Sequence, residues 1–120
     1  MPSALANASV PNATDTLSAS AAKIVTGAAT AVSGFAAAKN LVIQLECTAS
    51  SGTNPTLDVI VQDTVDGTNY FTIATFTQLI TTGIEVKRVS TAFTDTLKVS
   101  WTIAGTNPSF TFSVKSFADA

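Results

Sequence analysis

Residues that could carry out chemistry are few in this chain, and their spacing forms no reaction centre. The sequence contains no histidine, which removes the commonest general base and a common metal ligand. Serine and threonine are frequent, but a hydroxyl nucleophile without histidine lacks an activating base. Cys47 is the single thiol, so a zinc site is excluded as well. We therefore predict a protein that is not an enzyme and binds no cofactor.

Two acidic residues are close enough in the sequence to be candidate calcium ligands or paired catalytic carboxylates. These are Asp63 and Asp66. Calcium requires six or more oxygen ligands from a denser acidic loop, whereas an Asp-Gly turn explains Asp66 and a strand end explains Asp63. Gly52 and Gly105 precede predicted strands and not helices, so they form no phosphate-binding loop. We predict no metal site and no phosphate site.

Aromatic residues offer a second chemistry, because an exposed ring on a β-sheet can stack on a sugar. Tyr70 and Phe71 are the candidates for such a platform. Trp101 alternates with Val99 and Ile103 and is predicted to lie in the core. One or two rings make a small platform, so sugar binding is kept as an alternative function.

The composition indicates one domain of low charge. At 120 residues, the chain can bury roughly two thirds of its unfolded surface without disulfides or metals. The net charge is -2 and 12% of the residues are charged, whereas nucleic-acid binders need clustered Lys and Arg. Lys87 and Arg88 are adjacent, but neighbours on a strand point to opposite faces. We expect no nucleic-acid partner.

The N-terminal residues have neither the basic stretch nor the apolar core of a signal peptide. No apolar run approaches the roughly 20 residues that a membrane-spanning helix needs. The single cysteine, Cys47, cannot form an intrachain disulfide and is predicted to pack as a small buried apolar residue. These observations lead us to expect a chain that folds in the cytoplasm where it is translated, with no membrane partner.

Alternating apolar and polar residues predict β-strands. Residues 41–76 predict three strands in an antiparallel meander. Its turns are expected at residues 50–55 and at Asp66-Gly67, where the pair supplies the positive φ angles of a tight hairpin. Residues 84–90 predict an edge strand that is protected by charge.

A second hairpin is predicted from residues 97–103 and 110–114, joined by the loop 104–108. The tetrapeptide Gly-Thr-Asn-Pro occurs in this loop and also at residues 52–55. In one interpretation both copies form the same kind of turn, in which glycine takes an unusual backbone angle and asparagine before proline is extended. In the other, both loops lie at one end of the fold and form a docking rim for a partner.

These elements predict an all-β fold, an antiparallel two-sheet β-sandwich of about seven strands, either jelly-roll or immunoglobulin-like. Residues 1–21 are rich in Ala, Ser, Asn and Thr and predict an extended N-terminal arm, and residues 22–120 predict the sandwich domain. Within the latter, residues 22–35 are expected to form a strand with a bulge at Gly27. The expected core residues are Leu45, Val59, Phe76, Trp101, Phe110 and Phe112.

Several sequence phrases resemble known β-sandwich families. The segment VQDTVDGTNYFTIATFT, at residues 61–77, resembles a turn of galactose-binding, discoidin-like jelly rolls over about fifteen residues. A longer likeness, over about residues 34–114, is to small virion proteins of tailed bacteriophages. Its motifs are the GTNPTLDVIVQD and DGTNYF segments, an Ala-Thr-Phe-Thr strand end, a Thr-Gly turn, and a Trp-x-Ile-x-Gly-Thr-Asn-Pro-Ser-Phe-Thr-Phe segment.

The phage resemblance implies a structural protein of the virion, of the head decoration or cement type, which binds and stabilises the outer surface of the capsid. It implies the major capsid protein and neighbouring copies as partners, and assembly in the host cytoplasm. A trimer would match local threefold positions of an icosahedral lattice. The alternatives are a carbohydrate-binding module and a phage tail or connector component. The resemblance carries over no catalytic, cofactor-binding or metal-binding residue, because its motifs are turns and core positions.

Overall fold

A computed structural model describes residues 13–89 and 91–119 of the chain. This part of the chain is built from strands and turns, without a helix, which confirms the predicted all-β class. It therefore holds no helix that is long and apolar enough to cross a membrane. The described strands are β1 (Ala13–Lys23), β2 (Gly27–Ala28), β3 (Val32–Ser33), β4 (Asn40–Thr64), β5 (Tyr70–Thr75), β6 (Gly83–Val89) and β7 (Thr96–Asp119).

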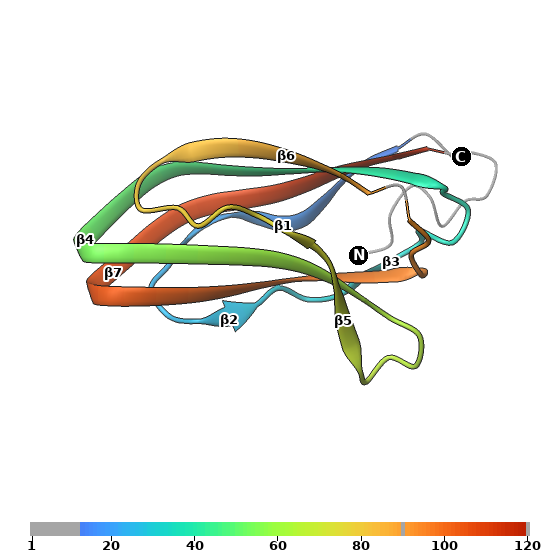
Figure 1. The fold of residues 1–120 in the computed structure, drawn as a ribbon, viewed down its shortest axis with the longest axis horizontal. Coiled ribbons are helices and arrows are strands. Elements are labelled where there is room, and N and C mark those ends of the chain that lie inside the picture. The colour runs from blue at the N-terminus through green and yellow to red at the C-terminus, as the bar shows by residue number, and fades with distance from the viewer. Residues whose placement is uncertain (1–12, 90, 120) are drawn as a thin grey trace.

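Two long strands, β4 and β7, form the centre of the fold. They pair antiparallel from Asn40 opposite Asp119 to Thr64 opposite Thr96. Figure 1 shows that this two-stranded ribbon folds over on itself, so that both strands turn back at the same end of the molecule. Each long strand thus contributes one half to each of two layers. This folded ribbon makes the sandwich jelly-roll-like and not immunoglobulin-like, which the sequence left open.

The remaining strands extend the two halves of the ribbon. One layer has the order β1, β7, β4 and β6, built from the C-terminal half of β7 and the N-terminal half of β4. In the other layer β2 and β3 pair with the first half of β7, and β5 pairs with the second half of β4. The outermost strand of the first layer is β6, which confirms the predicted edge strand.

The two Gly-Thr-Asn-Pro segments lie opposite each other where the ribbon folds, with Thr53 paired to Thr106. Gly52 and Gly105 have φ angles of 111° and 120°, which residues other than glycine rarely adopt. A Cβ on Gly52 would lie 2.7 Å from the backbone oxygen of Asn107, and one on Gly105 would lie 2.8 Å from that of Asn54. Each corner therefore requires a glycine, because a side chain at that position would clash with the backbone of the other corner.

The structure corrects the predicted hairpins. The chain does reverse at residues 50–55 and 104–108, but the two halves of β4 hydrogen bond to β7 and not to each other. The first hairpin of the predicted meander over residues 41–76 and the hairpin over 97–114 are therefore wrong, whereas the second hairpin of the meander is confirmed by the antiparallel pairing of β4 with β5. The backbone of Asn54 and Asn107 is also not extended, because both have a φ of 49°. Asparagine tolerates this left-handed conformation better than most residues.

The N-terminal part of the described chain also differs from the prediction. Residues 13–21 of the predicted arm belong to β1, which pairs with β7 from Ala13 opposite Ala118. Leu17 of this strand is buried against the core. Residues 1–12, which make up the rest of the arm, lie outside the described residues. The strand expected over residues 22–35 is divided into the end of β1 and the short strands β2 and β3.

The core lies between the two layers and contains every residue that was predicted for it. The inward positions of β4 and β7 alternate with outward ones, as the burial patterns of both strands show. The rings of Trp101 and Phe112 meet edge to face, with centroids 5.5 Å apart. The predicted core residues that are buried are Leu45, Val59, Phe76, Trp101, Phe110 and Phe112.

A Gly52→Ala substitution tests the corner. We expect it to lower the free energy of unfolding by at least about 1–3 kcal/mol, the cost of a strained φ, with the backbone clash adding to that loss. Gly67→Ala is the matched control, because Gly67 has a φ of 82° but open space around its Cβ position. Urea unfolding of both variants provides the measurement. Equal losses in the two variants would show that the close approach of the corners does not matter.

Candidate binding surfaces

The candidate carboxylates accept hydrogen bonds within turns and loops. Asp66 lies in the turn between β4 and β5, where its Oδ1 accepts hydrogen bonds of 2.8 Å from the backbone N–H groups of Thr68 and Asn69. Its Oδ2 accepts another from Nδ2 of Asn69. Asp63 Oδ2 accepts a hydrogen bond from the N–H of Thr94. No group of three or more potential metal ligands occurs within residues 13–89 and 91–119.

The hydrogen bonds to Asp66 lower the pKa of its carboxyl group well below the usual value, because each donor stabilises the charged form. Gly67 beside it has a φ of 82°, as predicted, whereas Asp66 itself does not take a positive φ. The β4–β5 connection is thus the predicted hairpin, but its turn is longer and is organised by one carboxylate.

The candidate aromatic residues do not form a shared platform. Lys98 Nζ lies 3.8 Å from the centroid of the Tyr70 ring and covers one of its faces. Phe71, the next residue along β5, is 65% exposed, and neighbouring strand residues point to opposite sides. Trp101 is buried, as predicted, and its Nε1 donates a hydrogen bond to the carbonyl oxygen of Val25. Phe71 alone remains as a candidate ring for sugar stacking.

The single cysteine behaves as a packing residue. Cys47 is buried, and burial raises the pKa of its thiol. Its Sγ donates a weak hydrogen bond of 3.4 Å to the carbonyl oxygen of Ala49. A buried thiol with a raised pKa is a poor nucleophile, so the prediction of an inert Cys47 is consistent with the structure.

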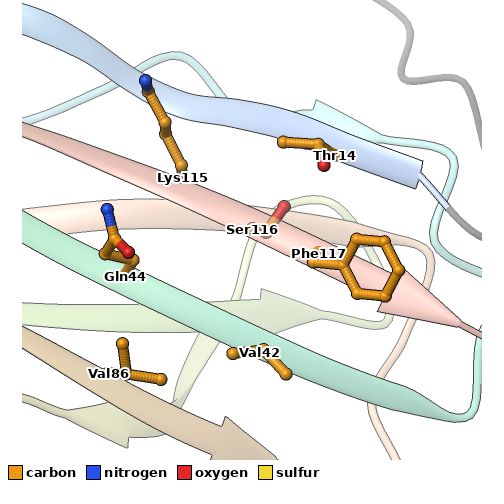
Figure 2. A pocket seen from close by; sticks show the side chains of 7 residues that line it. All are labelled: Thr14, Val42, Gln44, Val86, Lys115, Ser116 and Phe117. Carbon is orange, nitrogen blue, oxygen red and sulfur yellow. The ribbon is translucent and has the colours of Figure 1, made fainter.

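The outer face of the layer β1–β7–β4–β6 carries a shallow groove of about 260 Å³ (Figure 2). The pairing registers align Thr14, Phe117, Val42 and Arg88 in one row across the four strands. The adjacent row contains Thr16, Lys115, Gln44 and Val86. The residues that line the groove are Thr14, Val42, Gln44, Val86, Lys115, Ser116 and Phe117.

This outer face carries apolar and polar side chains next to each other. Phe117 is 44% exposed and lies beside Val42, and Figure 2 shows the Phe117 ring, Val42 and Val86 on the strands that form the groove. Gln44 and Lys115 border these apolar side chains. A mixture of exposed apolar and polar side chains is also found in protein-binding surfaces of non-obligate complexes.

Sequence reasoning missed this outer face. Val42 and Phe117 each occupy a single outward position in a strand whose other outward residues are mostly polar. The available signal was an apolar residue at an outward position of an alternating strand. That signal was weak, because three segments of the chain must pair in the correct register before these side chains meet.

Comparisons with known proteins agree on fold and not on family. No protein-family model and no curated protein matches the chain. Among solved structures, the PBSX exported protein XepA has a TM-score of 0.61 at 10% identity. The match covers 97% of this chain and 38% of XepA, so the chain spans less than two thirds of the XepA chain. The likeness shows a shared fold.

A second solved structure with this fold is a carbohydrate-binding domain. It is the CBM36-1 domain of a multidomain xylanase from the hindgut metagenome of Trinervitermes trinervoides, with a TM-score of 0.52 at 9% identity. The match covers 91% of this chain and 98% of that domain. A chain from infectious bursal disease virus Gx strain has a TM-score of 0.49 at 15% identity, over 90% of this chain and 32% of that one.

An Asp66→Ala substitution tests the role of the carboxylate in the turn. We expect it to lower Tm at pH 7, because three N–H donors of the turn lose their acceptor. The native pKa of Asp66 lies below its unfolded value near 3.8, so the stability that it provides is full above pH 4 and is lost as the pH falls through the native pKa.

The measurement is the difference in Tm between the wild type and the Asp66→Ala variant, followed from pH 7 downwards. The difference should stay constant to about pH 4 and shrink below it. A difference that already vanishes between pH 7 and pH 5 would show that Asp66 is not the acceptor that holds this turn.

Proposed function

We propose that this chain is a non-enzymatic structural protein of a bacteriophage particle, which binds the outside of the capsid as a decoration or cement protein. The outer face of the layer β1–β7–β4–β6 is the surface that supports the proposal best. It presents Phe117, Val42 and Val86 to the outside of a sandwich whose candidate chemical groups are engaged in packing and turns.

The sequence resemblance to tailed-phage virion proteins supports the same function. Its motifs fall on the elements that build the fold: the two Gly-Thr-Asn-Pro segments form the corner, and the Asp-Gly-Thr-Asn segment forms the β4–β5 turn. The resemblance therefore concerns a scaffold, as expected for a protein that acts by binding. The chain has a core of its own, which is what a protein that is added to a finished shell requires.

The proposal includes the partners and the place of action. The major capsid protein offers the complementary surface, and neighbouring copies of this chain provide further contacts. The protein acts on the capsid surface of the virion after it folds in the host cytoplasm. A homotrimer is the oligomer that matches a local threefold position of the lattice. A tail or connector location is the alternative within the same class.

A Phe117→Ser variant tests attachment through this face. Purified protein is mixed with capsids that lack it, the particles are sedimented, and the bound copies are counted and imaged by electron microscopy. We expect the wild type to give regular density on the head and Phe117→Ser to reduce binding at least tenfold, because the variant loses the largest apolar side chain of the face.

The matched control for that experiment is Phe71→Ser. Phe71 is more exposed than Phe117, but it lies on β5 in the other layer. This variant should bind capsids like the wild type. Density on tails instead of heads would move the protein to the alternative location, and binding to no particle would refute the proposal.

Carbohydrate binding is a second candidate function. It is supported by the shared fold with the CBM36-1 domain, which covers nearly all of both chains, and by the exposed ring of Phe71. A glycan array is the first measurement. If a glycan binds, Phe71→Ala should lower its affinity about tenfold or more without changing Tm, since stacking on one ring contributes on the order of 1–3 kcal/mol in comparable base stacking. Val65→Ala, a change at a neighbouring exposed apolar residue, should leave affinity unchanged.

A further inference from the structure

Within residues 13–89 and 91–119, β6 forms the most regular edge of the sandwich. Seven consecutive residues, Gly83–Val89, pair with β4 without a register shift, whereas β1 has two shifts against β7 and β5 has one against β4. The strands β2 and β3 have two residues each. Irregular and short edges resist pairing with another chain. Charged side chains resist it too, but the charges that were predicted to protect β6 can pair with the charges of an identical strand, so β6 can accept a second copy of itself.

We propose that this edge binds the same edge of a second copy, as an antiparallel β6–β6 pair related by a twofold axis at Val86. An extended strand can add to a sheet edge through its backbone groups, and a twofold axis makes both copies use the same surface. The pair would join the two layers β1–β7–β4–β6 into one continuous sheet. The inference gives a dimer in place of the homotrimer considered above, and it does not depend on attachment to capsids through Phe117.

Charge complementarity across the axis identifies the occupant as a second copy. With Val86 opposite itself, Glu85 of each copy lies opposite Lys87 of the other. Glu85 and Lys87 already form an ion pair of 3.3 Å within one chain, so both charges are held on the same side of the strand. Opposite charges at directly opposed positions stabilise antiparallel pairs, whereas like charges destabilise them. This register therefore gives two favourable cross-strand pairs.

The outer side of the same pair is complementary as well. Arg88 lies opposite Ile84 of the second copy in this register, and Ile84 is flanked on β4 by Glu46. Arg88 of one copy can thus extend over Ile84 towards Glu46 of the other. Within one chain these charges are far apart, because Arg88 pairs with Val42 and Val42 is four residues from Glu46, roughly 13 Å along the strand. In the described part of the chain neither of them makes an ion pair.

Apolar side chains fill the centre of the same surface. Val86 is 39% exposed and Ile84 is 62% exposed, although both belong to an edge strand whose other outward residue is charged. Twofold pairing places Val86 against Val86 of the second copy and covers part of each Ile84. Exposed apolar residues that are bordered by charges mark a protein-binding surface. Here the border is self-complementary, which favours a second copy over an unrelated partner.

Sedimentation of the full chain over a wide range of concentrations tests the pairing. We expect a reversible shift from a mass of 12.3 kDa to twice that mass. Val86→Lys should abolish the dimer, because it places two lysines at the axis, while circular dichroism shows an unchanged fold. Lys115→Glu is the matched control: it changes a charge on the same sheet face but on β7, two strands from the edge, and should leave the dimer intact.

Charge reversal provides the sharper test. Arg88→Glu and Glu46→Arg should each be monomeric, because each variant creates two like-charge pairs across the axis. An equimolar mixture of the two variants should form a dimer containing one copy of each, since both cross-axis pairs are then of opposite charge. Neither variant can form these opposite-charge pairs with a second copy of itself. A dimer that forms only in the mixture therefore cannot be explained by a change in the folding of either chain.

The outcomes that would overturn the proposal are separate from those of the capsid experiment. A monomer at every concentration, a trimer, or a dimer that Val86→Lys leaves intact would each refute the twofold pairing. Failure of the two charge variants to associate when mixed would refute the proposed register. Capsid binding by Phe117→Ser and Phe71→Ser is measured on other residues, so either proposal can fail while the other stands.

Discussion

The close approach of two backbone corners is the constraint on which the rest of this structure depends. Gly52 and Gly105 face the backbone of the opposite corner at distances that leave no room for a Cβ. The two long strands can therefore fold over together only if both corners lie opposite each other. That requirement fixes the register of β4 against β7 on both sides of the corner, with one further irregularity between Cys47 and Ala49. A slip of either half by one residue would reverse its inward and outward positions.

The fixed register explains both the core and the surfaces that are left for binding. It turns the alternating apolar residues of β4 and β7 towards each other across the two layers, so that burial of apolar area stabilises the fold. It also makes these two strands central in both layers, and leaves β1, β2, β3, β5 and β6 at the edges. Val42 and Phe117 meet on the outer face for the same reason.

The alternation in the sequence was sufficient to predict the all-β class, the edge strand β6 and the buried core residues, because burial follows a local period of two. It was not sufficient to predict pairing. A glycine-containing reversal is compatible with a hairpin and with a corner between layers, and only contacts between residues 52–55 and 105–108 distinguish them. Leu17 was overlooked for a related reason, since β1 has few apolar residues and is held mainly by its pairing with β7. The outer face likewise depends on pairing between distant segments.

Charge contributes little to holding this fold together. Within residues 13–89 and 91–119 there is one ion pair, between Glu85 and Lys87, and partly exposed pairs of this kind stabilise proteins only slightly. The two layers pack through an apolar core, and the strands within each layer are joined by backbone pairing. Outward charges such as Arg88 and Glu46 make no ion pair in the described residues. Substitutions at such outward positions can alter the binding surface without changing the packing of the core. A fold that is held by an apolar interior and by backbone pairing does not depend on the identity of its outward side chains, which agrees with a fold shared with XepA at 10% identity.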